Sequence, residues 1–229
     1  MASTEHAPVQ PNSREAVFML IKEGKGPNGQ GVAGTYDNWS KYDEDHNDYN
    51  GPSFVVSALS ELTNRKDVSI LDCGSGTGLI GEKLKSEGFT NISALDASQE
   101  SLKLAAKKGV YKKLSCVEVG KKKMPFDDNE FDVLVASGCV LPTHISPDAL
   151  REWVSIVKPG GFILFSIRRV FLELIEGEET YYSKEFVEHL NQVLEELEKT
   201  KKAEVIFKRD CPNYLCGWHS YLYGIKVVQ

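Results

Sequence analysis

The stretch that decides the fold is residues 68–78, which read Val68-Ser69-Ile70-Leu71-Asp72-Cys73-Gly74-Ser75-Gly76-Thr77-Gly78. It predicts a short buried strand that ends at an acid, followed by three glycines at alternate positions and then a helix. Glycine lets the backbone turn sharply and lets a ligand approach the main chain. The first N–H groups of the following helix lack helical partners and carry the positive end of its dipole. A nucleotide-like cofactor is therefore expected at this corner.

Two kinds of cofactor fit the spacing of the glycines. Residues 76–81 match the G-x-G-x-x-G fingerprint of dinucleotide-binding folds, and Asp96 stands 20 residues after Gly76, where a ribose-binding acid is expected. Residues 70–78 also match a second pattern, in which apolar residues precede an acid and three alternate glycines. Asp72 would repel a phosphate and attract a cation, so it favours the second pattern. The first leaves an NAD-dependent oxidoreductase as an alternative.

Strands and helices alternate along the rest of the chain, which predicts an α/β, Rossmann-like, doubly wound and mostly parallel sheet. Strands are expected at 68–72, 91–96, 113–118, 131–136 and 162–167, and helices at 51–62, 79–87, 99–107, 147–157 and 184–199. Residues 158–161 should form a turn before the fifth strand. Two final strands, 203–209 and 220–228, have no helix between them and should pair as an antiparallel hairpin at the sheet edge. The sheet should thus have seven strands, and the ligand crevice should lie at the carboxyl ends of the parallel ones.

The composition limits the possible partners and compartments. The net charge is −6, so general affinity for nucleic acid is not expected, and the eight lysines between 103 and 123 are interpreted as a solvated face. Five cysteines without metal-ligand spacing indicate free thiols in a reducing compartment and no metal site. The sequence shows no apolar run of membrane-spanning length and no signal-peptide pattern. A cytoplasmic protein is expected, and a nuclear pool is compatible with the same features.

Four segments in order resemble the class I methyltransferases that use S-adenosylmethionine (SAM), whose fold ends in such a hairpin. They are residues 70–78, Ala94-Leu95-Asp96-Ala97-Ser98, the segment 124–134, which is similar to L-P-F-x-x-x-x-F-D-V-V, and Val157-Lys158-Pro159-Gly160-Gly161. SAM carries an ammonium and a sulfonium but no phosphate, which suits the acid beside the glycines. The resemblance implies that SAM is the cofactor and that the chain is a methyltransferase.

A narrower resemblance covers about residues 36–229 and points to the methyltransferase-like family of the Williams–Beuren syndrome critical region. It is carried by the segments 36–40, 42–43, 49–52, 181–183 and 212–215. The chain departs from related enzymes at Gly120, where they often have an aspartate that holds the adenine amino group.

Three units are expected along the chain. Residues 1–12 are polar, contain two prolines and should be disordered. Residues 13–66 should form a helical entry or lid segment, with a helix at 13–22 and a glycine-rich connector at 24–34. Residues 67–229 should form the SAM-binding methyltransferase domain.

The resemblance implies a SAM site composed of Tyr36, Trp39, Asp72, Gly74, Gly76, Gly78, Leu79, Asp96, Ala97, Ser137 and Gly138. Asp72 would attract the ammonium group directly or through water, and the two oxygens of Asp96 would accept both ribose hydroxyls. Tyr36 and Trp39 would close over the cofactor as a lid. The alternative for these two aromatic residues is plain packing of an N-terminal helix on the sheet.

The acceptor is expected to be a small molecule, with a protein as the alternative and with no membrane or nucleic-acid partner. His144, after the fourth strand, is the candidate general base if the acceptor must lose a proton. The candidate acceptor pocket consists of Tyr42, Tyr49, Arg168, Tyr181, Trp218 and His219. A protein that binds SAM without catalysis remains a further alternative, because the sequence shows no acceptor chemistry.

Overall fold

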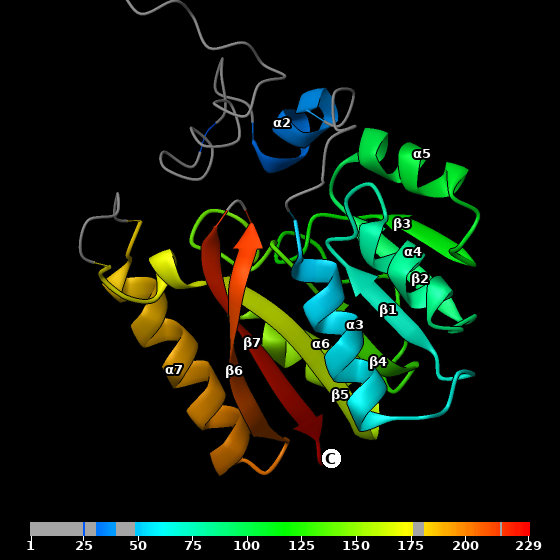
Figure 1. Ribbon diagram of the computed structural model, residues 1–229. Helices are drawn as coiled ribbons and strands as arrows, with labels where there is room; N and C mark the ends of the chain where they lie inside the picture. The colour runs from blue at the N-terminus through cyan, green and yellow to red at the C-terminus, as the bar shows by residue number, and fades with distance from the viewer. Residues whose placement is uncertain (1–24, 26–30, 40–48, 176–180, 216) are drawn as a thin grey trace, which may run out of the picture.

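The computed structural model describes residues 25, 31–39, 49–175, 181–215 and 217–229. These residues form a seven-stranded sheet in the order β3-β2-β1-β4-β5-β7-β6, with helices on both faces (Figure 1). Strands β1 to β5 pair in parallel, and β7 runs antiparallel to both β5 and β6. The predicted doubly wound sheet with a C-terminal antiparallel hairpin is confirmed.

The strands are β1 (Ile70–Cys73), β2 (Ile92–Asp96), β3 (Lys113–Cys116), β4 (Phe131–Ala136), β5 (Val157–Arg168), β6 (Ala203–Leu215) and β7 (Trp218–Val227). The described helices are α2 (Val32–Trp39), α3 (Gly51–Leu62), α4 (Leu79–Ser86), α5 (Gln99–Lys107), α6 (Ala149–Ile156), α7 (Lys184–Lys199) and a short 3-10 helix, η3 (Arg169–Phe171). None of them is long and apolar enough to cross a membrane.

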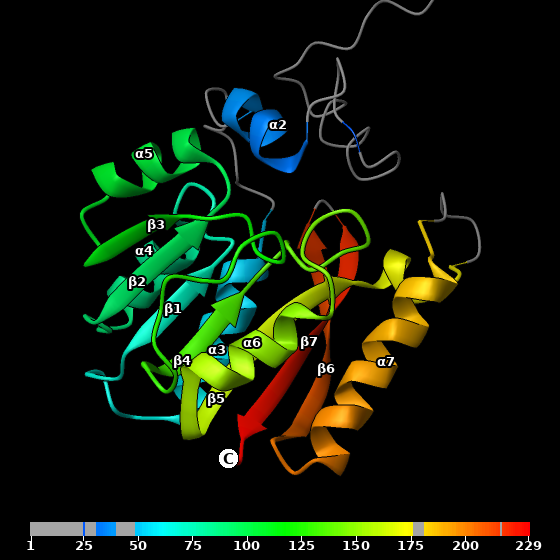
Figure 2. The same cartoon turned by 180° about the vertical axis from the view of Figure 1, so that it is seen from behind.

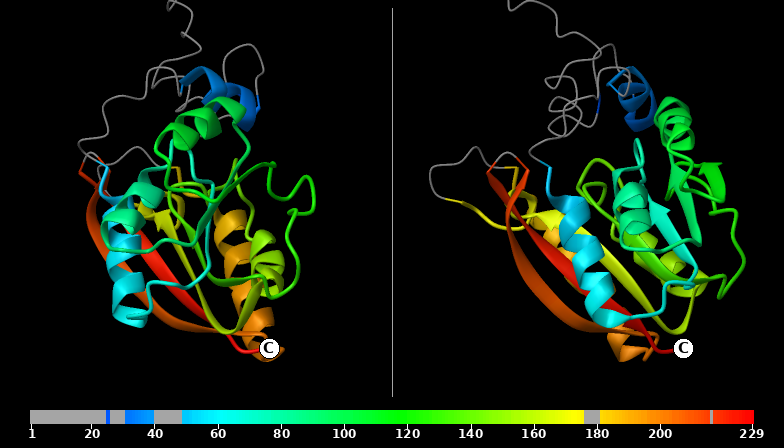
Figure 3. Two further views of the ribbon diagram at one scale, coloured as in Figure 1. Left: turned by 90° about the vertical axis from the view of Figure 1, so that its right-hand side faces the viewer. Right: turned by 45° about the vertical axis from the view of Figure 1, so that its right-hand side comes forward.

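The core has two layers because successive side chains of a strand point to opposite faces of the sheet. On one face, Ile70 packs with Leu59 of α3 and Leu84 of α4. On the other face, Leu71 belongs to the layer that contains Trp153 of α6 and Leu190 of α7. Figure 2 shows α6 and α7 over this second face, and the left view of Figure 3 shows the sheet between them and α3.

Several elements have the bounds that the sequence predicts. Helices α3, α5 and α7 and strand β4 begin and end at the expected residues. Ser98 caps α5, because its hydroxyl accepts the N–H of Ser101 at 3.0 Å. Local signals mark where these helices start: a Gly-Pro pair for α3 and serine caps for α5 and α7. Apolar residues at helical spacing follow each signal, so the bounds could be predicted.

The structure corrects the turn expected at residues 158–161. These residues lie inside β5, and the pairing with β4 shifts there from Phe131↔Val157 to Val133↔Phe162. Gly160 has φ +82°, and a Cβ on Gly161 would lie 2.4 Å from the Asp132 carbonyl oxygen. The two glycines therefore form a bulge against β4. This bulge needs glycines just as a turn does, so the sequence pattern of the two is alike.

Two further expectations were wrong at helix starts. Helix α6 begins at Ala149 rather than at residue 147, and its capping residue, Asp148, makes no side-chain cap bond. Residues 32–34 belong to α2 and not to a connector. The predicted helix at 13–22 and the disordered residues 1–12 lie outside the described residues.

Candidate functional site

The glycine corner connects β1 to α4 at the carboxyl edge of the sheet. Gly74, Gly76 and Gly78 all have left-handed backbone conformations, with φ of 71°, 53° and 91°. A Cβ on Gly74 would lie 2.7 Å from the Cys139 Sγ, whereas one on Gly76 would meet nothing within 4 Å. The first glycine is thus required by packing, and the second leaves open space above the backbone. A side chain at either position would also be strained by the positive φ.

Asp96 lies at the end of β2, directly beside this corner. Its Oδ2 accepts the N–H of Gly76 at 2.8 Å, and its Oδ1 accepts the N–H of Ser98 at 2.8 Å. Burial raises the pKa of this carboxyl, and the two backbone hydrogen bonds act against that rise. Each carboxylate oxygen keeps a further lone pair. Asp96 is therefore fixed in a position where it can accept two more donors, as a ribose would supply.

Asp72 lies beneath the glycine corner rather than in an open crevice. Its side chain is fully buried, and its Oδ2 accepts the Tyr111 hydroxyl at 2.7 Å. Within the described part of the chain, its Oδ1 has no hydrogen-bond partner. Burial raises the pKa of Asp72 to about 7. Of the two contacts expected between Asp72 and a ligand's ammonium group, direct or through water, the direct one is not available in this arrangement. Tyr111 was missed, because nothing local in the sequence marks it.

Helix α2 bridges two parts of the carboxyl edge, beside α5 (Figure 1). Asp37 accepts the Ser98 hydroxyl at 2.6 Å and the Glu100 N–H at 3.0 Å, so it adds a second cap to α5. The Tyr36 hydroxyl lies 3.0 Å from the Nε2 of His144 in the loop after β4. The helix is thus attached on both sides of the glycine corner. The side chain of Trp39 and all of Tyr42 lie outside the described residues.

His144 has both ring nitrogens engaged. Thr143 Oγ1 lies 3.0 Å from Nδ1, and Tyr36 occupies Nε2. Burial lowers the pKa of His144 to about 4. The imidazole is therefore neutral at pH 7 but a weak base, and its contacts make it an attachment point for α2.

Four hydroxyl groups form a cluster at the ends of β4, β5 and β6, hereafter the hydroxyl cluster: Tyr49, Ser137, Ser166 and Tyr214. The Tyr49 hydroxyl donates to Ser137 Oγ at 2.9 Å, and Tyr214 Oη lies 2.8 Å from both serine oxygens. The N–H of Gly138 points at Ser166 Oγ, 3.3 Å away. The cluster therefore fixes the chain at Ser137 and Gly138. Ser166 and Tyr214 were not predicted, since the four residues are far apart in sequence.

A second cluster lies at the end of β5, where Arg168 stacks on aromatic rings. Its guanidinium carbon is 4.5 Å from the ring centre of Trp218 and 5.2 Å from that of Phe171. The Tyr181 ring lies 6.2 Å from that of Trp218. Three of the predicted acceptor-pocket residues are thus brought together. His219 follows Trp218 in β7 and approaches Asp210 instead, at 3.6 Å.

The remaining expected residues are partly exposed near the corner. Leu79 begins α4 and Ala97 follows Asp96, and neither side chain is fully buried. Among the described residues, no group of three or more His, Cys, Asp or Glu side chains could hold a metal ion.

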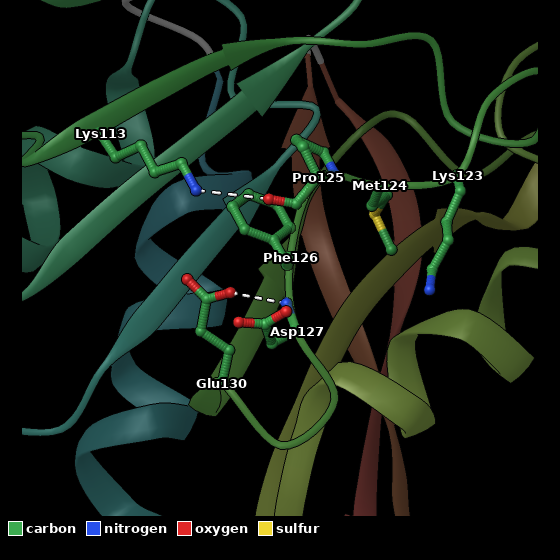
Figure 4. A pocket seen from close by; sticks show the side chains of 7 residues that line it. All are labelled: Lys113, Lys123, Met124, Pro125, Phe126, Asp127 and Glu130. Carbon is green, nitrogen blue, oxygen red and sulfur yellow. Dashed lines mark hydrogen bonds between the residues drawn. The ribbon is translucent and has the colours of Figure 1, made fainter.

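A hollow of about 410 Å³ lies elsewhere, at the start of β3 and in the segment before β4 (Figure 4). Lys113 Nζ donates to the Pro125 carbonyl at 3.3 Å, and Glu130 accepts the Asp127 N–H at 2.9 Å. These polar groups thus already have hydrogen-bond partners among the residues that line the hollow. The hollow is at the amino ends of the strands, away from the glycine corner.

Comparisons with known proteins agree with this geometry. Residues 71–165 match the family model described as "Methyltransferase domain". The human methyltransferase-like protein 27 is 30% identical over 138 residues, which cover 58% of this chain and 56% of that protein. A demethylmenaquinone methyltransferase of Chlorobaculum tepidum is 31% identical over 104 residues, 45% of this chain and 42% of the relative. The chain spans about half the length of these relatives.

A solved SAM-dependent methyltransferase from Clostridium acetobutylicum has the same fold, with a TM-score of 0.55 and 19% identity. The likeness covers 85% of this chain and 96% of that one. The fold is that of the class I methyltransferases. Residues 71–165 thus match a methyltransferase domain, within a fold that a solved SAM-dependent methyltransferase shares.

Proposed function

We propose that the whole protein transfers the methyl group of SAM to a small-molecule acceptor. The observation that carries the proposal is the combination of the open backbone at Gly76 with Asp96, whose two oxygens are already aligned by backbone donors. We further propose membership of the methyltransferase-like family of the Williams–Beuren syndrome critical region. The match to the human methyltransferase-like protein 27 supports it.

The residues present fit the cofactor. Asp96 would hold the ribose hydroxyls, Gly76 would let the nucleoside lie against the main chain, and Ser137 and Gly138 would face the methionine end. When bound, SAM supplies a methyl group on a sulfonium that is already activated for displacement. The protein then has to orient the acceptor and exclude water, which is a positioning task more than an acid–base one. The weak basicity of His144 is consistent with a protein that positions the acceptor rather than removing a proton from it.

The acceptor side favours a compact molecule with a flat or conjugated face. Trp218 and Tyr181 are partly exposed, and Arg168 provides a cation stacked between aromatic rings. Aromatic rings bind flat ligands through their faces, and a guanidinium orients carbonyl or carboxylate oxygens. The relative from Chlorobaculum tepidum is named for a quinone precursor, which belongs to this chemical class.

The test begins with calorimetric titration of the purified full chain with SAM, S-adenosylhomocysteine and NADH. Micromolar binding of the first two without an NADH signal is the expected result. Incubation of the protein with isotopically labelled SAM and a panel of quinones, phenols and carboxylic acids would then detect label in a small-molecule product. Binding of SAM without transfer to any compound or to protein in cell extracts would favour the non-catalytic alternative, and preferential binding of NADH would contradict the proposal.

A further inference from the structure

We propose that Tyr111 is a positioning residue of the SAM site: its hydroxyl joins Asp72 to the first turn of α4 and so maintains the glycine corner in its ligand-binding conformation. The inference rests on the proposed function, because it concerns the same site. Tyr111 lies between α5 and β3, outside the residues that the motifs single out.

The Tyr111 hydroxyl connects two elements that meet at the corner. It donates to Asp72 Oδ2 at 2.7 Å and accepts the N–H of Gly81 at 3.2 Å. Asp72 is the last residue but one of β1, and Gly81 lies in the first turn of α4. One oxygen thus joins the strand that enters the glycine corner to the helix that leaves it.

The ring of Tyr111 explains two glycines in the motif. A Cβ on Gly81 would lie 2.3 Å from the Tyr111 Oη, and a Cβ on Gly78 would lie 3.0 Å from its Cε2. Gly81 was the third glycine of the possible dinucleotide fingerprint. Its contact with Tyr111 gives it a different purpose, which is to make room for an aromatic ring against the helix. The tyrosine and these glycines therefore form one packing unit under the corner.

The same hydroxyl controls the charge of Asp72. A fully buried carboxylate is costly to ionise unless a donor faces it. The Tyr111 hydroxyl donates to Oδ2, and the Gly81 N–H also favours the charged form of Asp72. Asp96 from β2 disfavours that charge, the Cys139 thiol lies in the same electrostatic region, and Glu82 of α4 faces Tyr111. Removing the hydroxyl should keep Asp72 protonated to a higher pH. The negative potential beneath the site of a ligand ammonium would then be weaker at neutral pH.

The test compares Tyr111→Phe with Tyr223→Phe, which removes the hydroxyl of another largely buried tyrosine, in β7, where the ring stacks on Phe165. The dissociation constant of S-adenosylhomocysteine is measured by calorimetry from pH 6 to pH 9, together with the Tm of each protein. Tyr111→Phe should weaken binding about tenfold near neutral pH, because it removes the hydroxyl that the Asp72 carboxylate and the Gly81 N–H both contact. It should also move the rising part of the affinity–pH curve to higher pH. Tyr223→Phe should change neither.

A second variant keeps the inference testable if Tyr111→Phe does not fold. Asp72→Asn preserves the shape of the side chain but cannot ionise, so it should remove the rising part of the affinity–pH curve. A Tyr111→Phe protein with lower Tm but unchanged affinity and pH curve would overturn the inference, as would an Asp72→Asn protein that keeps the wild-type curve. Failure of the wild-type chain to bind SAM or S-adenosylhomocysteine would instead count against the proposed function.

Discussion

The two halves of the sheet hold their polar groups in different ways. In the half formed by β1, β2 and α4, the Asp96 carboxylate accepts the backbone N–H groups of Gly76 and Ser98. In the half formed by β5, β6 and β7, hydroxyl groups and aromatic rings contact one another. The backbone geometry of the first half is encoded by a contiguous motif. The second half is assembled from single residues of distant segments, so its specificity is free to differ between relatives that share the first.

The largest expected difference between the halves is in their response to pH. The folded pKa of Asp72 is raised to about 7 from an ordinary value of 3.8, so this group contributes stability at low pH that is lost as the pH rises through 7. The loss amounts to about 4 kcal/mol on an order-of-magnitude basis. Asp72→Asn should therefore gain unfolding free energy relative to wild type between pH 4 and pH 8, measured by urea denaturation.

Taking the difference between the two proteins isolates Asp72. The depressed pKa of His144 has the opposite sign, because its contribution is lost as the pH falls through 4. It is the same in both proteins and cancels. A constant difference in unfolding free energy over the whole pH range would contradict the assignment of a raised pKa to Asp72.

The next largest effect is expected on cofactor affinity. Asp96→Ala should weaken SAM binding about tenfold or more, because it would remove the two proposed charge-assisted hydrogen bonds to the ribose hydroxyls. It also leaves the Gly76 N–H without its acceptor. Asp132→Ala is the matched control. Asp132 also accepts a backbone N–H, from Ser69 at 2.8 Å, but at the start of β4 rather than at the glycine corner. The Asp132→Ala variant should lower Tm without changing the calorimetric dissociation constant of SAM. If Asp96→Ala bound SAM as tightly as wild type, the ribose would have to lie elsewhere.

A smaller effect, confined to stability, is expected in the hydroxyl cluster. Tyr214→Phe removes the hydroxyl that contacts both serines and should lower the unfolding free energy by about 1–2 kcal/mol. Burial raises the pKa of Tyr214, so this loss should be the same from pH 6 to pH 8. Denaturant titrations at the two pH values provide the measurement. A pH-dependent loss would remove the contrast with Asp72.

The smallest effect is expected at α2. Asp37→Ala removes the second cap of α5 and should cost about 1 kcal/mol of unfolding free energy. Amide hydrogen exchange of residues 32–39 should become faster, while α3 should be unaffected. Glu185→Ala, in the exposed first turn of α7, is the control. Unchanged exchange in α2 would show that Tyr36 and His144 suffice to hold the helix.

The contrast between the halves also explains what the sequence could reveal. The mostly parallel sheet, the hairpin and the position of Asp96 follow from local periodicity and a contiguous motif, so they were predictable. The bulge at Gly160 was not, because the same residues suit a turn, and the deciding contact of Gly161 is with β4. Tyr111, Ser166 and Tyr214 were missed for a related reason. Their roles depend on partners at least 28 positions away in the chain, which no local pattern encodes.

The hydroxyl cluster has one further consequence, which concerns the arrangement of its hydrogen atoms. Its four hydroxyls make five close oxygen–oxygen contacts with one another, yet each hydroxyl supplies a single hydrogen. At least one contact must therefore lack a hydrogen at any moment, so more than one arrangement of the hydrogens fits the same oxygen positions. The cluster can reverse its polarity by rotating O–H bonds while every heavy atom stays in place. A molecule that reaches Tyr49 could thus find either a hydrogen-bond donor or an acceptor there, without any rearrangement of the backbone.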